Sequence, residues 1–295
     1  MPSYRFCRPD DIPFLVRAVN ECFTVHFPET EPMTGESFRR EMKALDLWPS
    51  SCMVAVADDE PKAVLTGAKR PEETLVSRIG VRPGEERQGH AGHLLTSLSQ
   101  KLAVLGPPRL VAEVPAALPG AGAFFQSLGW RREAAFTDRE RPATAGAVEP
   151  PPEGLVAPAT VDELEASGAL PGEQAGPEAP PWSRQARTLR NRRDDLRALA
   201  VASPDRVEAW LVYDPGGNDA GEGGAVEVLA FGAQDPEHRE LLLGALLRQA
   251  IRDAGARPVR LARLRDGELP EELLTALGFE RREEYHRYSA EAQPL

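Results

Sequence analysis

The chain has 295 residues, which is enough for two domains of ordinary size. Its apolar content of 41% and charged content of 27% are typical of soluble globular proteins. The net charge of −11 disfavours a nucleic-acid partner, whose phosphates would be repelled, and mildly favours cationic acceptors such as amines.

The cysteines and the N-terminal residues indicate in which cellular compartment the protein is expected. Cys7, Cys22 and Cys52 are odd in number and lack the spacing of a metal site or a CxxC pair, so we expect a reducing cytoplasm and no metal. Cys7 and Cys52 fall in or near expected strands, where we expect them to be small buried residues. The chain shows no signal-peptide core and no stretch of the roughly 18 apolar residues that span a bilayer, so we expect no membrane partner.

The first part of the chain alternates short strands with amphipathic helices. Pro9-Asp10-Asp11 offers an N-cap for the first helix. Two apolar stretches on either side of a polar turn predict a hairpin. In chain order, the expected elements are a strand at 4–8, the first helix, a loop over 26–35, a second helix over about 36–45, and hairpin strands at 53–57 and 63–67.

The chemistry is expected in the stretch that follows. An apolar run over 75–81 predicts a strand, a Gly-rich turn comes next, and leucines at helical spacing predict a helix that runs to Gly106. A strand, a Gly-rich turn and a helix collect backbone N–H groups at the helix N-terminus, where phosphate binds. We therefore expect the pyrophosphate of a coenzyme at this turn. A strand at 109–114, a short helix ending at Gly129 and a strand beginning at 133 follow.

A segment rich in Pro, Ala and Gly, residues 141–154, predicts a linker between a domain at 1–140 and a domain at 155–295. After the linker the order of elements repeats. Gly106 and Gly255, each at the end of a helix, lie 149 residues apart, as do Leu128-Gly129-Trp130 and Leu277-Gly278-Phe279. We interpret this as a tandem duplication of one α/β unit. Two unrelated α/β domains with similar helix spacing are the alternative.

The two copies differ at the Gly-rich turn. At the same spacing, Gly89 becomes His238 and Ala91 becomes Glu240. Pro236 supplies no backbone N–H, and the acids at 235, 237 and 240 would repel a pyrophosphate. We expect the second copy to keep the fold and to have lost the anion site.

The loop gives the first copy a resemblance to the GNAT superfamily of N-acetyltransferases, and the whole chain resembles a tandem GNAT protein. The family's loop has the pattern Arg/Gln-x-x-Gly-x-Gly/Ala, followed by a helix with a Leu-Leu pair. Here the loop is Glu86-Arg87-Gln88-Gly89-His90-Ala91, and Leu94-Leu95 follows. Glu86 departs from the pattern, so Arg87 or Gln88 is expected to supply the polar contact.

A second family marker is a helix with the approximate pattern Asn-x-x-Ala-x-x-Phe-Tyr-x-x-x-Gly-Phe. Residues 118–130 match it at four positions, which are Ala121, Phe124, Gly129 and Trp130. Leu118 replaces the Asn. Phe125 replaces the Tyr that in many members protonates the leaving thiolate of coenzyme A, so at this position we expect packing alone.

The resemblance implies an α+β fold of two GNAT domains, each a mixed, twisted sheet of six to seven strands flanked by helices. The central strands would diverge after Val81 on one side and near Val111 on the other. The resemblance also implies acetyl-CoA as co-substrate, with its pantetheine arm along the backbone of Ile79, Gly80 and Val81. The pyrophosphate would bind the loop and the first turn of the helix, at Arg87, Gln88, Gly89, His90, Ala91 and Gly92.

The reaction implied is direct transfer, in which an amine attacks the thioester and a base removes its proton. Glu113 is our candidate base, acting through a water; an ordinary outward-facing strand residue is the alternative. His26 and Phe27 lie in the loop that lines the acceptor site in the family, and we expect them to bind substrate. Trp48 is expected to pack in the core, and the side chains of His90 and His93 are expected at the surface.

Arg87 is expected to be a phosphate ligand, because a cation at a helix N-terminus is unfavourable unless an anion is bound. The basic run over 184–197 indicates a solvated helix face with i,i+4 ion pairs rather than a nucleic-acid patch. The sequence thus predicts an acetyl-CoA-dependent N-acetyltransferase acting on a small-molecule or peptide amine, as a monomer or weak homodimer. The alternative is a non-catalytic coenzyme-A-binding or structural pseudo-acetyltransferase.

Overall fold

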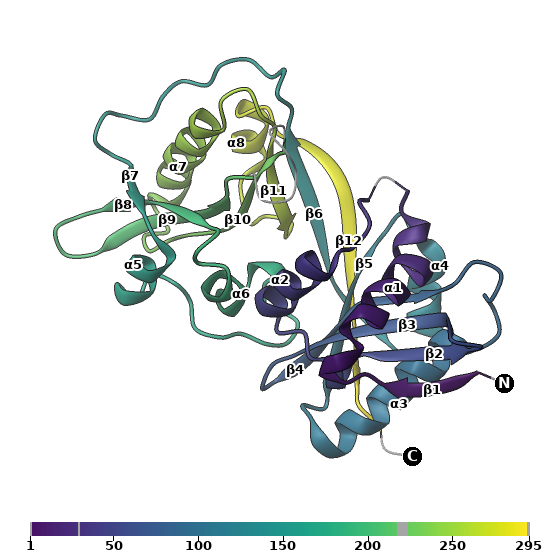
Figure 1. The fold of residues 1–295 in the computed structure, drawn as a ribbon. Coiled ribbons are helices and arrows are strands. Elements are labelled where there is room, and N and C mark those ends of the chain that lie inside the picture. The colour runs from purple at the N-terminus through teal and green to yellow at the C-terminus, as the bar shows by residue number, and fades with distance from the viewer. Residues whose placement is uncertain (1, 29, 217–223, 294–295) are drawn as a thin grey trace. The chain divides into compact units, whose positions relative to one another are not determined.

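The computed structural model describes residues 2–28, 30–216 and 224–293 (Figure 1). The chain divides into two compact units. The first unit comprises Met1–Val114, Leu118–Glu133 and Arg287–Leu295, and the second comprises Pro115–Ala117 and Ala134–His286.

The first unit is a six-stranded sheet, counted over the described residues, with helices on both faces. Strands β1 to β4 pair in antiparallel fashion, and β4 pairs with β5 in parallel. In order across the sheet, the strands are β1 (Ser3–Phe6), β2 (Met53–Ala57), β3 (Glu60–Lys69), β4 (Glu73–Val81), β5 (Arg109–Pro115) and the last part of β12 (Glu280–Glu291).

Two helices of the first unit cover each face of this sheet. On one face Leu15 and Phe38, from α1 and α2, pack on Val54 and Val64. On the other, Leu94 of α3 packs with residues of β3 and β5, and α4 contributes Phe125. The helices are α1 (Ile12–Cys22), α2 (Gly35–Leu45), α3 (His90–Leu105) and α4 (Pro119–Ser127), with 3-10 turns at Pro9–Asp11, Thr24–His26 and Pro49–Ser51.

The parallel strands β4 and β5 separate early. Their pairing runs only from Glu73 opposite Arg109 to Leu75 opposite Val111. The expected point of divergence on β4, after Val81, is therefore wrong, whereas Val111 on β5 is confirmed. The register between β3 and β4 shifts around Ser77, and such a bulge bends a strand. As a result β4 runs from Val76 to Val81 without β5 beside it.

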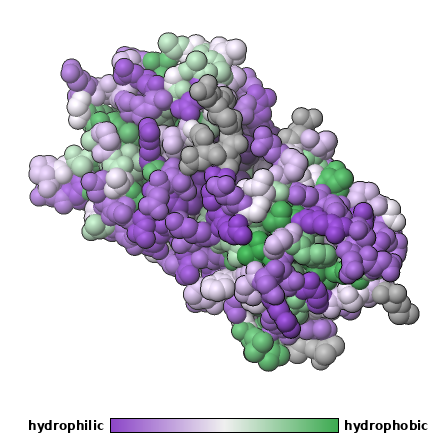
Figure 2. Space-filling model, in the orientation of Figure 1, coloured by the Kyte–Doolittle hydropathy of each residue, from purple (hydrophilic) through white to green (hydrophobic). Residues whose placement is uncertain are grey.

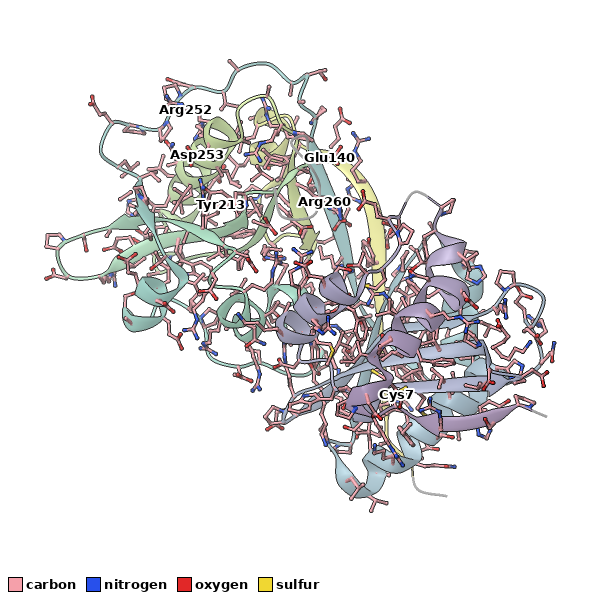
Figure 3. All side chains as sticks on the ribbon, viewed as in Figure 1. Cys7, Glu140, Tyr213, Arg252, Asp253 and Arg260 are labelled. Atoms are coloured by element: carbon pink, nitrogen blue, oxygen red, sulfur yellow. The ribbon has the colours of Figure 1, made fainter. Side chains whose placement is uncertain are left out.

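The second unit repeats this arrangement, which confirms two tandem domains of one fold. β10 and β11 pair in parallel over three residues, and the register of β10 with β9 shifts around Leu229. Tyr213 of β9 donates a hydrogen bond to Asp253 of α7 at 3.3 Å (Figure 3). Across the sheet the strands are the first part of β12, β6 (Arg131–Arg141), β11 (Val259–Leu264), β10 (Val226–Ala233), β9 (Val207–Asp214), β8 (Arg197–Ala202) and β7 (Ala157–Ala159). The helices are α5 (Val161–Ala166), α6 (Ala186–Asn191), α7 (Arg239–Ala254) and α8 (Glu271–Ala276), with a 3-10 turn at Trp182–Arg184.

The last strand of each half has part of its length in the unit of the other half, which for β6 is residues 134–141 and for β12 is residues 287–291. Strand β6 follows the first half in sequence, but it pairs with β11 in the second unit, with Val259 opposite Arg141. The end of β12 follows the second half, yet its residues from Arg287 onward belong to the first unit. In Figure 1, β6 is the teal strand and β12 the yellow one. The compact units therefore differ from the contiguous ranges 1–140 and 155–295, which stay our proposal for the sequence repeats.

The three cysteines are buried, as expected for Cys7 and Cys52, and Cys7 lies inside the first unit (Figure 3). Burial raises the pKa of each thiol from 9.0 to about 12.

We predict that none of the three thiols reacts with a thiol reagent near pH 8 until the protein is unfolded. Because the unfolded thiols ionise near pH 9 and the folded ones do not, stability should fall as the pH rises from about 9 toward 12. Thermal melts at pH 8 and pH 10 test this, and an unchanged melting temperature would contradict it.

Candidate functional site

The Gly-rich turn presents a set of backbone donors without acceptors. It joins Val81, the end of β4, to His90, the start of α3. Gly84, Arg87 and Gly89 have positive φ values of 87°, 63° and 85°, which fold the chain tightly. Within the described part of the chain, the backbone N–H groups from Arg87 to Gly92 donate to no protein acceptor; the first helical bond runs from His93 N to Gly89 O. Such donors at the start of a 16-residue helix suit an anion.

Space and charge beside the turn also suit an anion. A Cβ atom built on Gly89 or on Gly92 would have no atom within 4 Å. Arg87 is exposed and forms no ion pair or hydrogen bond among the described residues. The Glu86 carboxylate, which departs from the family pattern, accepts the N–H of Gly84 at 2.7 Å. Glu86 therefore stabilises the turn itself and leaves the donors from Arg87 onward free.

The edge of β4 offers a second row of backbone groups. Gly80 is opposite Val64, and Arg82 N–H donates to Lys62 O at 2.9 Å. In an antiparallel ladder, the peptide groups of Ile79 and Val81 must then point away from β3, to the side that β5 has left. These groups can pair with an extended ligand, as a strand would.

The close packing of α1 on β4 explains why residue 80 is a glycine. A Cβ atom on Gly80 would lie 2.1 Å from the carbonyl oxygen of Cys22, the last residue of α1. Only glycine lets the end of α1 approach β4 so closely. The side of Gly80 that faces α1 is thus fixed by packing, while the peptide groups of Ile79 and Val81 face the side that β5 has left, where the Val81 carbonyl already accepts a hydrogen bond from His26.

The two candidate acceptor residues lie at the end of β4. His26 Nε2 donates to the Val81 carbonyl at 2.8 Å, and Phe27 packs on Phe23 with ring centroids 4.9 Å apart. A neighbour of this cluster that the sequence does not predict is Arg78, whose guanidinium lies over the Phe23 ring at 5.7 Å and pairs with Glu41 of α2. The partners are 37 residues apart, and no local pattern links them.

Two aromatic or imidazole side chains differ from expectation. His90 is not at the surface: it is 5% exposed, and its Nδ1 lies 2.8 Å from the Tyr4 hydroxyl. Its imidazole is thus part of the packing, and only its backbone N–H faces the turn. His93 is exposed, as expected, and stacks on Tyr4. Trp48 was expected in the core but is 55% exposed.

Phe125 packs, as expected. It is 2% exposed, with its ring 4.9 Å from that of Trp130 and stacked at 5.8 Å on Tyr288 of β12. The candidate base Glu113 lies on β5, and its Oε1 accepts from Arg287 Nη2 at 2.9 Å. Both side chains are at most 3% exposed. This buried ion pair favours a structural role for Glu113 over that of a base.

In the second unit the corresponding turn is occupied by its own carboxylate. Asp235 accepts the N–H of Glu237 at 2.8 Å and contacts His238 Nδ1 at 2.7 Å. The hydrogen bond with His238, followed by that from Glu237, lowers the pKa of Asp235, so it stays negative at neutral pH. An anion at this turn would meet a fixed negative charge.

The side chain of Arg184 fills the place where β10 and β11 diverge. Arg184 Nε donates to the Leu229 carbonyl on β10 at 2.6 Å, and its Nη1 donates to the Arg263 carbonyl on β11 at 2.9 Å. The guanidinium pairs with Glu268 and lies 5.3 Å from the centre of the Phe231 ring. In the first unit the equivalent place is the free edge of β4.

The basic run of the second unit is thus not a face of i,i+4 pairs. Its helix α6 is only six residues long, and the partners are distant in sequence. Arg190 pairs with Glu165 at 2.8 Å, and Arg193 pairs with Asp162 at 3.0 Å. The expectation of a solvated helix held by local pairs is wrong, because Arg184 is a core residue.

The comparison with protein families agrees with the geometry of the turn and the edge. A sequence profile described as the acetyltransferase (GNAT) family matches residues 13–130. Residues 13–130 are therefore similar to this family, and they make up most of the first half of the chain. A comparison with curated protein sequences gives no match.

Solved structures extend the family's fold to the whole chain. A GCN5-related N-acetyltransferase from Sphaerobacter thermophilus is 16% identical, with a TM-score of 0.66 over 99% of this chain and 96% of that one. A tandem GNAT protein from the clavulanic acid biosynthesis pathway is 18% identical, with a TM-score of 0.67 over 100% of both chains. A glucosamine N-acetyltransferase region of a fungal multi-domain β-N-acetylglucosaminidase is 13% identical, with a TM-score of 0.71 over 98% of this chain and 38% of that one. The chain therefore has the tandem GNAT fold.

Within residues 2–28, 30–216 and 224–293, no helix is both long and apolar enough to cross a membrane. In the same ranges, no three or more His, Cys, Asp and Glu side chains gather in a group that could hold a metal ion.

Proposed function

We propose that the first unit binds acetyl-CoA and transfers its acetyl group to a primary amine of a small molecule or peptide. Enzymes of the GNAT family transfer acyl groups from acyl-CoA, and residues 13–130 match the model of this family. The observation that carries the proposal is the set of unpaired N–H groups from Arg87 to Gly92 beside the open space at Gly89. These donors would hold the pyrophosphate, with the Arg87 guanidinium beside it.

The pantetheine arm would extend along β4 and pair with the peptide groups of Ile79 and Val81. The acyl carbon would then lie near the end of the strand, where His26 and Phe27 line the approach of the amine. The nitrogen–carbon bond forms as the carbon–sulfur bond breaks, and the amine proton passes to water or to a base. Glu113 stays a prediction for that base, although its pairing with Arg287 favours water.

The leaving thiolate meets no hydroxyl from Phe125. Its proton would come from solvent, since a thiol with a pKa near 8.5 is an adequate leaving group at neutral pH. The same residue supports the second candidate function, a coenzyme-A-binding protein without turnover. We further propose that the protein acts in the cytoplasm as a monomer or weak homodimer, without a metal, nucleic-acid or membrane partner.

The two functions are separated by one pair of experiments. Calorimetry with acetyl-CoA measures binding, and thiol release from acetyl-CoA with a panel of amines, amino acids, aminoglycosides and N-terminal peptides measures transfer. Release above the hydrolysis background with any acceptor supports the transferase and excludes the non-catalytic protein. Binding without release from the whole panel favours the second candidate. No heat and no thermal shift at millimolar acetyl-CoA would contradict both.

We predict one coenzyme per chain. The Asp235 carboxylate occupies the turn of the second unit, and Arg184 fills its strand divergence. Isothermal titration with coenzyme A should therefore give a stoichiometry near one, and the substitution H238E should leave both the stoichiometry and the affinity unchanged. A stoichiometry of two would show that the second unit binds as well.

A further inference from the structure

The exchanged strands β6 and β12 occupy equivalent places. At the repeat spacing of 149 residues, Phe136, Asp138 and Arg139 correspond to Tyr285, Arg287 and Tyr288. All six are buried, and the residue between the first two in each strand is intermediate. The two strands thus bury the same positions, although Tyr285 lies in the second unit and only Arg287 and Tyr288 lie in the first. The residues at two of these positions differ in chemistry.

At the position shared by Asp138 and Arg287, the charges in the two strands are opposite. In the first unit Arg287 of β12 pairs with Glu113 of β5 at 2.9 Å, and both are almost fully buried. In the second unit the equivalent residue is Asp138 of β6, which is 4% exposed at its side chain. Asp138 accepts the backbone N–H of Arg263 at 2.7 Å and lies 3.2 Å from Nε of Arg260, both on β11. Figure 3 labels Arg260 on β11 and Glu140, opposite it on β6.

At the position shared by Arg139 and Tyr288, the two side chains differ in size and in charge. In the first unit Tyr288 lies against Gly122 of α4, where a Cβ atom would come within 2.6 Å of the tyrosine hydroxyl. In the second unit the equivalent pair is Arg139 and Glu271 of α8, which form an ion pair at 2.6 Å. The Tyr288 ring therefore requires a glycine, and the Arg139 guanidinium requires a carboxylate.

We propose that these two positions specify the strand exchange, because each strand fits the other half's unit and is rejected by its own. Strand β6 in the first unit would bury Asp138 against Glu113 and would leave Arg139 beside Gly122 without a carboxylate. With its end in the second unit, β12 would replace Asp138 by Arg287 near Arg260, whose side chain is 40% exposed and also lies 3.6 Å from Glu227. It would also press Tyr288 on Glu271, whose side chain is 57% exposed. Burying like charges, or one charge without its partner, costs far more than an exposed pair gains.

The proposal also bears on the coenzyme-binding unit, and this consequence rests on the proposed function. Tyr288 stacks on Phe125, and Arg287 pairs with Glu113 on β5, the strand that diverges from β4. A first unit that received β6 would change both contacts next to the acyl site. The two positions thereby ensure that the unit with the intact turn receives the strand that fits it.

Two double-cysteine variants report which strand follows β5. Ala116 N–H donates to Glu284 O at 2.7 Å, so A116C with E284C should be joined by a short bis-maleimide in the exchanged arrangement. Ala135 lies 149 residues before Glu284, and β6 now lies one strand further from β5, beyond β12. Oxidation of A116C with A135C should therefore form a direct disulfide only if β6 takes the place of β12. Peptide mapping by mass spectrometry identifies each link, and the native cysteines are buried. In the natural background we expect the first link and not the second.

The decisive variant carries D138R together with R287D, which moves each charge to the other strand. We expect the link between positions 116 and 284 to be lost from most molecules and the link between positions 116 and 135 to appear. The same link pattern and melting temperature as in the natural background would overturn the proposal. A second test needs no rearrangement: R287E should lower the melting temperature by roughly 10 °C, and E113R should restore most of it. If E113R restores nothing, the proposal also fails.

The steric position has a matched control on the same helix. G122A should lower the melting temperature, and adding Y288F should restore it, because the clash involves the hydroxyl. Gly120 also lies in α4, but a Cβ atom there has open space, so G120A should raise the melting temperature slightly. Equal effects of G120A and G122A would show that Gly122 does not select the strand. None of these stability readings depends on coenzyme binding, so they can fail while the proposed function stands.

Discussion

G89E is expected to raise the dissociation constant for acetyl-CoA at least about 100-fold, which corresponds to about 2.7 kcal/mol. The glycine has a φ of 85° and sits next to open space, so the glutamate side chain fits but carries its charge to the place of the pyrophosphate. The positive φ adds a backbone cost of about 1–2 kcal/mol. Isothermal titration calorimetry measures the constant, and circular dichroism checks that the fold is kept.

Two control variants separate charge from strain in this experiment. G89A retains the backbone cost without the charge, so it should weaken binding much less than G89E. H238E places the same side chain in the second unit, beside Asp235, and should change nothing. If G89E binds acetyl-CoA as well as the natural protein, the turn is not the pyrophosphate site.

R184A is expected to destabilise the protein by about 3–5 kcal/mol, which is the cost of leaving one member of a buried ion pair behind. The Arg184 side chain is 4% exposed, and its removal leaves two strand carbonyls without this donor and Glu268 with the backbone N–H of Arg265 but without its ion pair to Arg184. Burial opposes ionisation of Glu268, but Arg184 outweighs it and holds the pKa of this carboxyl below its usual value. Chemical denaturation measures the free energy of unfolding.

Rescue by guanidinium tests the contacts themselves. Millimolar guanidinium should raise the melting temperature of R184A while leaving that of the natural protein unchanged, because the cavity offers the same acceptors. R190A is the matched control: its partner Glu165 is 44% exposed at the side chain, so the loss should be within about 1 kcal/mol and without rescue. If R184A lowers the free energy of unfolding no more than R190A does, Arg184 does not stabilise the divergence of β10 and β11 as we infer.

Much of the fold follows from local patterns. The start of α1 after Pro9-Asp10-Asp11, the hairpin and the helix that runs to Gly106 lie where periodicity and turn residues place them, although Pro9–Asp11 forms a 3-10 turn and the Asp11 side chain does not cap α1. The repeat spacing of 149 residues also appears in the structure, since β6 and β12 bury the same positions. The helices, turns and hairpin depend on residues that are close in sequence. The repeat can be found by comparing the two halves of the sequence with each other.

The features that escaped prediction depend on distant partners. Strand periodicity shows which face of β6 is buried but not which unit buries it, because both units offer an equivalent edge. The run of arginines has the composition of a surface helix, and only the tertiary fold reveals that Arg184 is a core residue. His90 is buried by Tyr4, which lies 86 residues away, and neither residue carries a local signal for the other.

The exchanged strand also sets the order of events during synthesis. The first unit contains the turn at Gly89, yet its sheet is completed by β12, the last strand of the described chain. Residues 2–133 can therefore emerge from the ribosome and still lack their final strand for about 150 residues more. During that interval β5 presents an open edge that β6, its nearest neighbour in sequence, could take. A nascent chain of this kind lacks the last strand of its first unit until β12 has been made, so truncation after Glu284 should abolish the proposed coenzyme binding, although the turn at Gly89 lies some 200 residues earlier.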